Sequence, residues 1–203
     1  MFISFEGIEG SGKSTLLENL KKYYLKKELE VIFTKEPGGT ELGKDIRGIL
    51  LNPESSISSE AELLLLMADR IEHVTTIINP NLKKNKIIFC DRYIDSTFAY
   101  QVYGKKVKKI FIDNIHKFIL KKIKPNITFI LKVSTKISKQ RLKKRKTKNR
   151  YDNFPQSFYS KAQKSFLKLA KGKTNYFVLD SSKNDKNLEK LIFGIVSKRL
   201  GIK

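Results

Sequence analysis

A strand-like apolar run at the N-terminus leads directly into a glycine-rich turn that ends in Lys and Ser. Residues 7–15 read Gly-Ile-Glu-Gly-Ser-Gly-Lys-Ser-Thr, which satisfies the pattern G-x4-G-K-[ST], and a helical pattern follows at once. Glycines let successive backbone N–H groups point at phosphate oxygens, and the helix N-terminus adds partial positive charge. The lysine then reaches the β and γ oxygens, and the first hydroxyl takes Mg²⁺. We therefore expect an ATP-type triphosphate here; a glycine-rich turn without a ligand is the alternative.

The residues expected at this phosphate site are all consecutive. They are Gly7, Ile8, Glu9, Gly10, Ser11, Gly12, Lys13, Ser14 and Thr15.

Five short β-branched or aromatic runs alternate with helical stretches along the chain. The strand-like runs are Phe2–Phe5, Val31–Thr34, Ile87–Cys90, Ile127–Val133 and Tyr176–Leu179. The helical stretches include Ser14–Lys27, Glu60–Ile78, Lys108–Ile123, Lys136–Lys144, Gln156–Ala170 and Asn187–Leu200. Near-continuous apolar runs are typical of buried parallel strands, and their alternation with helices is typical of α/β proteins. The sequence predicts a three-layer fold of the P-loop NTPase type, with a five-stranded parallel sheet flanked by helices.

The last helical stretch carries its apolar side chains at helical spacing. We expect them to form one stripe that faces the sheet. They are Leu188, Leu191, Ile192, Ile195 and Val196.

Length and composition favour one domain. A chain of 203 residues with 40% hydrophobic content can bury one sizeable core, and no Pro/Gly/Ser-rich linker divides residues 1–203. No apolar run approaches the roughly 18 residues that span a bilayer, and the first ten residues contain acids instead of a basic head. We expect a cytoplasmic protein without a membrane partner. The single cysteine, Cys90, lies in an apolar run, which excludes a disulfide framework and predicts a buried, inert thiol.

The net charge of +22 by itself suggests nucleic acid, an anionic membrane or phosphorylated small molecules as partners. Most of the 42 basic residues are Lys and recur along the whole chain, which favours a compositional drift over solvated faces. The seven Arg residues are the informative minority, because a guanidinium offers phosphate a planar fork. Residues 143–150, KKRKTKNR, are too charged for a core and predict a mobile surface loop.

The third strand-like run ends in an acid. Asp91 follows Ile87–Cys90, as expected of a residue that helps to hold the metal through water. Capping the next helix is the alternative role, and the two are compatible.

Three motifs beyond the phosphate turn decide between P-loop proteins. They are Thr34–Thr40, reading TKEPGGT; Ala68–His73, reading ADRIEH; and Asp91-Arg92-Tyr93 with Ser96, Ala99, Tyr100 and Gln101 behind it. In order and spacing, the chain from Phe2 to about Ala170 resembles the thymidylate kinase family. The resemblance implies transfer of the γ-phosphoryl of ATP to dTMP with Mg²⁺ as cofactor, and a homodimer.

The resemblance also implies roles at the acceptor site. Arg47 and Arg92 would grip the dTMP phosphate from two sides, and Arg70 would hydrogen-bond the thymine edge. Tyr100 would pack on the deoxyribose and disfavour a 2′-hydroxyl, and Glu9 would lie near the 3′-hydroxyl. The other implied dTMP contacts are Glu36 and Pro37, with a cis peptide between them, Thr97 and Gln101 beside the base, and Leu66 where the family usually has a stacking Phe.

For catalysis, the resemblance implies Lys13 and Arg92 with Ser14 and Asp91 at the metal. It adds a small mobile lid at about 141–155 and, from that lid, Arg150, since the phosphate turn contains no arginine. Arg150 matches the Arg of the family's Asp-Arg-x-Glu element, written here Asn149-Arg150-Tyr151-Asp152, and Arg145 is the substitute candidate. Arg141 matches a position near the adenine, although a solvated role is equally compatible.

Two other functions are compatible with parts of the sequence. A small P-loop kinase acting on a nucleoside or an alcohol would not require paired arginines for an acceptor phosphate or the EPGGT string. A basic nucleic-acid-binding ATPase would suit the charge, but aromatic residues for base stacking are scarce in residues 136–150. We therefore expect no specific nucleic-acid partner.

Overall fold

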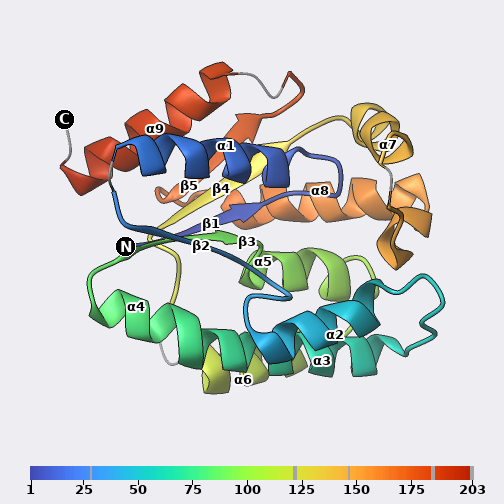
Figure 1. Cartoon of the computed structure of the whole chain (residues 1–203). Coiled ribbons are helices and arrows are strands. Elements are labelled where there is room, and N and C mark those ends of the chain that lie inside the picture. The colour runs from blue at the N-terminus through green and yellow to red at the C-terminus, as the bar shows by residue number, and fades with distance from the viewer. Residues whose placement is uncertain (28, 121–122, 146, 184–185, 202–203) are drawn as a thin grey trace.

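The computed structural model describes residues 1–27, 29–120, 123–145, 147–183 and 186–201. Five parallel strands form one sheet in the order β2-β3-β1-β4-β5 (Figure 1). They are β1 (Phe2–Glu6), β2 (Val31–Lys35), β3 (Ile87–Asp91), β4 (Ile127–Lys132) and β5 (Tyr176–Asp180). The expected five-stranded parallel sheet is confirmed, and β1 lies at its centre with Phe2 opposite Ile88 and Ile3 opposite Ile127.

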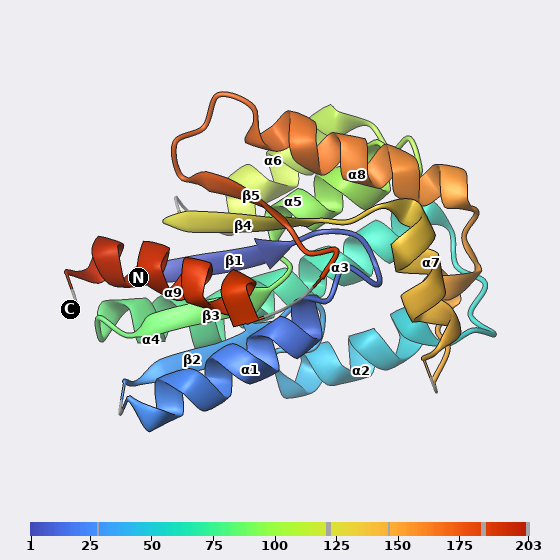
Figure 2. The ribbon, with the colours of Figure 1, turned by 90° about the horizontal axis from the view of Figure 1, so that it is seen from above.

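Helices cover both faces of the sheet, as Figures 1 and 2 show. On one face lie α1 (Lys13–Lys26) and α9 (Lys186–Leu200). On the other lie α3 (Ser59–His73), α4 (Asn79–Lys83), α5 (Ile94–Thr97), α6 (Lys109–Leu120) and α8 (Gln156–Ala170), with α2 (Glu41–Leu51) packed against α3. Two π-helical turns, η1 (Val74–Ile78) and η2 (Phe98–Val102), continue α3 and α5. Beyond the carboxyl ends of the strands lie α7 (Thr135–Lys143) and the 3₁₀ turn η3 (Arg150–Asn153).

The alternation of side chains along β1 divides the core between the two faces. Ile3 and Phe5 pack with α1 and α9, whereas Phe2 packs with the buried side chains of α3 and α6. A third cluster joins Ile130 to η2 and α8. Burial of β1 on both faces explains why the adjacent residues Phe2 and Ile3, which point to opposite faces, are both apolar.

Several details differ from the sequence predictions. Leu191 is 51% exposed, because Leu188, Ile192 and Val196 define the buried face of α9 and Leu191 lies at its edge. The helix α2 was not predicted. The helix predicted over Lys108–Ile123 is found as α6 (Lys109–Leu120), and positions 121 and 122 of that prediction lie outside the described residues. Position 146 of the predicted lid is likewise outside the described residues.

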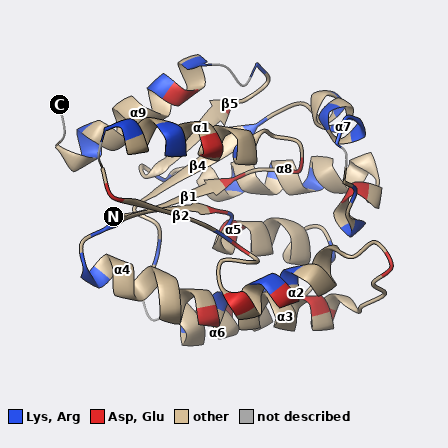
Figure 3. Cartoon of the chain, in the orientation of Figure 1, with Lys and Arg blue, Asp and Glu red and all other residues tan. Residues whose placement is uncertain are grey.

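Basic side chains are distributed along the chain. Figure 3 shows Lys and Arg on α1, α4, α7, α8 and α9, which agrees with the interpretation of the net charge as compositional drift. Within the described part of the chain, no helix is both long and apolar enough to cross a bilayer.

Candidate functional site

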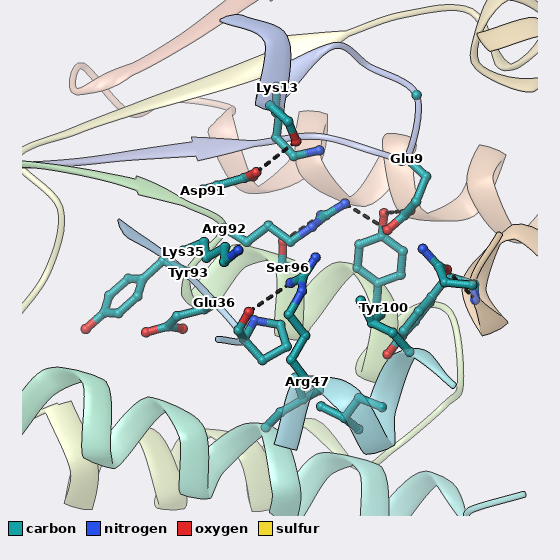
Figure 4. Close-up of a pocket in the computed structure, with 18 of the residues that line it drawn as sticks. Glu9, Lys13, Lys35, Glu36, Arg47, Asp91, Arg92, Tyr93, Ser96 and Tyr100 are labelled. Atoms are coloured by element: carbon teal, nitrogen blue, oxygen red, sulfur yellow. Dashed lines mark hydrogen bonds and ion pairs between the residues drawn. The ribbon is translucent and has the colours of Figure 1, made fainter. Parts of the chain in front are cut away.

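A cavity of about 590 Å³ opens at the carboxyl ends of β1, β2 and β3, between the phosphate turn, α3, η2 and the segment after α7 (Figure 4). Most of the expected site residues line it. These are Glu9, Gly10, Gly12, Lys13, Ser14, Thr15, Glu36, Pro37, Arg47, Leu66, Arg70, Asp91, Arg92, Thr97, Tyr100, Gln101 and Arg141.

The remaining expected residues do not line the cavity. Gly7, Ile8 and Ser11 belong to the phosphate turn without lining the cavity, Ile8 and Ser11 being fully buried, and Arg150 pairs with Glu62 instead.

The phosphate turn joins β1 to α1 in a conformation that needs glycine. Gly10 and Gly12 have φ values of 70° and 91°, in the left-handed region. A Cβ at Gly10 would also lie 2.7 Å from the carbonyl oxygen of Ser138. The Ser138 hydroxyl donates to the carbonyl oxygen of Glu9 at 2.7 Å, so α7 helps to fix the turn, a contact that the sequence did not indicate.

Lys13 lies inside the turn and is only 6% exposed. Its Nζ donates to the carbonyl oxygens of Gly7 at 2.9 Å and Ile8 at 3.1 Å, and to Ser11 Oγ at 3.3 Å. Burial, together with the nearby Arg92 guanidinium, lowers the pKa of Lys13 to about 8. The ammonium group is thus held at the base of the cavity, where an anionic phosphate would restore the charge balance.

Ser14 and Asp91 meet at the start of α1, 77 residues apart in sequence. Ser14 Oγ donates to Asp91 Oδ2 at 3.4 Å, while Asp91 Oδ1 is buried without a partner among the described residues. A hydroxyl beside an unpartnered carboxylate oxygen is a donor set that suits Mg²⁺. No described group of three or more His, Cys, Asp or Glu could hold a metal by itself, so the ion would be held jointly with the phosphates. Asp91 does not cap α5, whose N-terminus has no side-chain cap.

Arg92 follows β3 with φ of 70°, a conformation that is costly for a side chain with a Cβ. Its backbone N–H donates to the carbonyl oxygen of Phe5 at 2.9 Å. The guanidinium donates through Nη1 to the Gly7 carbonyl at 2.9 Å and to Ser96 Oγ at 3.0 Å, and through Nη2 to Glu9 Oε1 at 2.8 Å. These contacts tie the β3–α5 turn to the phosphate turn.

Glu9 is held by two partners across the cavity wall. Arg92 pairs with Oε1, and the Tyr100 hydroxyl donates to Oε2. Burial acts to raise the pKa of Glu9, but Arg92, Lys13 and the Tyr100 hydroxyl outweigh it, so that the pKa lies below its usual value. Glu9 is therefore an ionised carboxylate beside a tyrosine ring that lies over Arg92.

Behind this layer, Glu6 is fully buried. Its Oε1 accepts the backbone N–H of Tyr93 at 2.8 Å, and its Oε2 accepts the Ser96 hydroxyl at 2.6 Å. Burial, and next the Asp95 carboxylate, raises the pKa of Glu6 to about 7. Glu6 and Ser96 thus support the Arg92 turn from behind.

The segment after β2 shapes the opposite wall. The Glu36–Pro37 peptide bond is cis, as predicted, and the Pro37 carbonyl accepts Arg47 Nη1 at 2.8 Å. Asp69 Oδ1 accepts the Gly38 N–H at 2.9 Å, which ties the segment to α3. Burial and the Glu36 carboxylate raise the pKa of Asp69 to about 6. Arg47, from α2, and Arg92, from β3, therefore approach one cavity from different elements, as Figure 4 shows.

Arg70, on α3, is 2% exposed. Its Nε donates to Glu36 Oε2 at 2.7 Å, and Glu36 Oε1 lies 2.9 Å from His73 Nδ1. Arg70 Nη1 donates to Thr97 Oγ1 at 2.8 Å. The predicted base-contacting residues Arg70 and Thr97 are thus bonded to each other.

The two lid arginines lie in different surroundings. Arg145 lines the cavity and pairs with Asp152 at 3.4 Å. Arg150 instead pairs with Glu62 of α3, a buried carboxylate that also accepts Lys105 at 2.6 Å and the Gln101 amide at 2.8 Å. Arg150 Nε is buried without a partner among the described residues.

Arg141, at the end of α7, hydrogen-bonds the backbone of two other segments, the phosphate turn and the segment after β5. It donates to the carbonyl oxygens of Gly10 at 3.2 Å, Ser181 at 2.9 Å and Ser182 at 2.7 Å. Arg141 is therefore anchored between the phosphate turn and the segment after β5, which argues against a purely solvated role.

Sequence reasoning missed the buried side chains that three helices place around the site. Glu62 accepts hydrogen bonds from Gln101 and Lys105 and pairs with Arg150 of the lid. Ser138 hydrogen-bonds the backbone of the phosphate turn, and His116 contacts Arg70 from α6. The sequence does not show which polar residues of an amphipathic helix are buried; only the folded structure does.

Comparisons with known proteins agree with the geometry. The family model described as thymidylate kinase matches residues 5–192. The chain is 40% identical over 200 residues to a thymidylate kinase of Thermosipho africanus, covering 98% of this chain and 99% of that one. It is 46% identical over 173 residues to one from Wolbachia of Brugia malayi, covering 84% and 81%. A crystal structure of thymidylate kinase from Ehrlichia chaffeensis superimposes with a TM-score of 0.76 at 32% identity, covering 97% of this chain and 98% of that chain.

Proposed function

Because the chain belongs to the thymidylate kinase family, we propose that it transfers the γ-phosphoryl group of ATP to dTMP, giving ADP and dTDP. The observation that carries the proposal is the convergence of Lys13, Arg47 and Arg92 on one cavity. Lys13 belongs to the phosphate turn, whereas the two arginines approach from α2 and β3. A cavity with cations on two sides suits two phosphorylated substrates placed end to end, which is what in-line phosphoryl transfer requires.

The triphosphate of ATP would lie in the turn at the N-terminus of α1. There the backbone N–H groups and the partial charge of the helix favour phosphate, and Lys13 lies at the base of the turn. Ser14 and Asp91 would hold Mg²⁺ together with the phosphates, where the ion neutralises charge on the transferring group. Arg141, anchored beside the segment after β5, would border the adenine.

The acceptor nucleotide would occupy the side of the cavity bordered by Pro37, Leu66 and η2. Arg47 and Arg92 would orient its phosphate, because two planar guanidinium forks fix the position of an oxyanion better than one. Arg92 is already held by Glu9 and Ser96, so little side-chain entropy would be lost when the phosphate binds.

The nucleoside would lie deeper in the acceptor site. Arg70, Thr97 and Gln101 are within the wall at this point, and Leu66 would exclude water from the base. Glu9 with Tyr100 would border the sugar, where the tyrosine ring leaves little room for a 2′-hydroxyl. Glu36 would act mainly by holding Arg70 through their buried ion pair.

The segment at about 141–155 would act as a lid that excludes water and completes the charge stabilisation. Arg150 pairs with Glu62 in the structure, so it must exchange that carboxylate for the transferring phosphoryl group when the lid closes. Arg145 already lines the cavity and is the competing candidate for this role.

Measurement of ADP release with a panel of acceptors tests the proposed function. The purified protein is assayed with ATP, Mg²⁺ and one of dTMP, dUMP, UMP, CMP, AMP or GMP. We expect the highest kcat/KM with dTMP, and a loss of activity when Mg²⁺ is removed with EDTA. ADP release that does not depend on dTMP would contradict the proposal.

Two further proposals concern the whole protein. We expect a homodimer, as the family resemblance implies and as exposed apolar side chains on α3 and α6 favour, and a location in the cytoplasm. The exposed apolar residues are Leu64, Ile71, Ile110, Phe111 and Phe118.

A further inference from the structure

Arg70 uses almost all of its hydrogen-bonding capacity inside the protein. A guanidinium has five N–H groups and no acceptor. Nε donates to Glu36, the two N–H groups of Nη1 point at Thr97 Oγ1 and His116 Nε2, and Nη2 donates to the Tyr93 carbonyl at 3.1 Å. One N–H, on Nη2, therefore has no acceptor among the described residues, and Arg70 lines the cavity.

His116 supplies one of these four acceptors from α6, 46 residues away in sequence. Its Nε2 lies 2.7 Å from Arg70 Nη1, and because a guanidinium can only donate, Nε2 must be the unprotonated nitrogen of a neutral ring. Burial, and next the positive charge of Arg70, lowers the pKa of His116 to about 3. The ring therefore accepts from Arg70 throughout the neutral pH range.

The position of the His116 ring is itself fixed by packing. The side chain is 6% exposed, and Phe98 meets it edge to face with ring centroids 5.6 Å apart. On α6, one turn on either side, Ile112 and Ile119 are buried in the core between α3 and α6. Because the ring is held in place, it fixes the direction of the Arg70 N–H group that donates a hydrogen bond to it.

We propose that His116 is a positioning residue for recognition of the acceptor base. His116 accepts the second N–H of Arg70 Nη1. The unpaired N–H of Nη2 is then the only Arg70 donor left to hydrogen-bond a carbonyl oxygen of the base. This inference rests on the proposed function, in which Arg70 borders the base. Because Arg70 offers one donor and no acceptor, it suits a pyrimidine with a carbonyl at that position and disfavours cytosine, which carries an amino group there.

Two substitutions of His116 separate the hydrogen bond from the volume of the ring. His116→Leu removes the acceptor, whereas His116→Gln keeps an acceptor oxygen. With His116→Leu, we expect KM for dTMP to rise by about tenfold, the equivalent of one net hydrogen bond of ~1.4 kcal/mol, with kcat within about twofold and KM for ATP unchanged. The ratio of kcat/KM for dTMP to that for dCMP should fall. With His116→Gln, KM for dTMP should stay within about threefold of the wild-type value.

A matched control distinguishes positioning from general loss of packing. Ile112→Ala removes buried volume from the same helix without touching Arg70, so it should lower the melting temperature and leave KM for dTMP unchanged. Binding of dTMP measured by calorimetry serves as a second measurement. If His116→Leu does not fold, His116→Asn, whose amide is too short to reach Arg70, is compared with His116→Gln.

The possible outcomes keep the two proposals apart. Wild-type activity on dTMP together with an unchanged KM for dTMP in a folded His116→Leu variant would overturn the role of His116 alone. An equal rise of KM for ATP and dTMP would do the same, because it would indicate general distortion. If the wild-type protein neither binds nor phosphorylates dTMP, the proposed function fails and the role of His116 fails with it.

Discussion

Among single residues, Lys13 offers the most direct test of the phosphate site. Its ammonium is held by three oxygens of the turn and would neutralise phosphate charge in the transition state. We expect Lys13→Ala to lower kcat by at least about 10²-fold, as loss of one charge-stabilising group commonly does. Stability should change by only about 1 kcal/mol, since the substitution removes both hydrogen bonds and the cost of burying a cation.

Lys21→Ala is the matched control for Lys13→Ala. Lys21 is an exposed lysine on the same helix, and its substitution should leave kcat unchanged. Near-wild-type turnover of Lys13→Ala in the ADP-release assay would remove the assignment of the turn to ATP.

Glu6 makes stability depend on pH in a predictable direction. Its pKa is raised in the folded protein, so its contribution to stability is fully present below the unfolded pKa of about 4.5 and is lost as pH rises through about 7. Gln cannot titrate. The destabilisation caused by Glu6→Gln should therefore be smaller at pH 8 than at pH 5, by about 1–3 kcal/mol.

Urea unfolding at the two pH values measures this difference. Glu18→Gln, on the exposed face of α1, serves as the control and should show no such difference. A pH-independent effect of Glu6→Gln would mean that Glu6 is ionised in the folded protein throughout this range.

At the scale of elements, the lid between α7 and α8 decides where the catalytic arginine comes from. We expect Arg150→Ala to lower kcat and kcat/KM alike by roughly 10³-fold, as for other arginines that act on a transferring phosphoryl group. Arg150→Lys should recover only part of this loss, because a point charge lacks the planar fork. Arg145→Ala should stay within about threefold of the wild-type kcat, as expected for an exposed charge.

The reverse pattern in the same kinetic assay would transfer the role to Arg145. Lys148→Ala, which removes an exposed lid charge, is the control for a general effect of charge in this segment. Equal small effects of all three substitutions would contradict a catalytic lid arginine altogether.

At the scale of the whole molecule, the apolar surface of α3 and α6 predicts self-association. Phe118 is 76% exposed on α6, and Leu64 is 54% exposed on α3. Large apolar side chains left exposed on neighbouring helices are typical of interfaces between subunits. We expect the wild-type protein to be a dimer by light scattering and Phe118→Glu to shift it toward the monomer. Leu25→Glu, which alters a similarly exposed side chain on the opposite layer, should leave the mass unchanged.

The sequence by itself determined the local features of this protein. The short β-branched and aromatic runs predicted the five strands, because such residues favour strands and near-continuous apolar runs are typical of buried parallel strands. The phosphate turn was also readable, since its glycines, Lys13 and Ser14 are adjacent in the chain. The resemblance to the family predicted Arg47, Arg70 and Arg92 at an acceptor site, and all three line the cavity.

The tertiary structure alone decided the contacts between distant segments. His116 hydrogen-bonds Arg70, and Ser138 hydrogen-bonds the backbone of the phosphate turn. Glu62 accepts hydrogen bonds from Gln101 and Lys105 and pairs with Arg150. His116, Glu62 and Ser138 each lie on a helix, where a polar side chain is ordinarily solvated and the sequence offers no sign that it is buried. Only the packing of α3, α6 and α7 against their neighbours removes these groups from water, and a buried polar group must then find a partner.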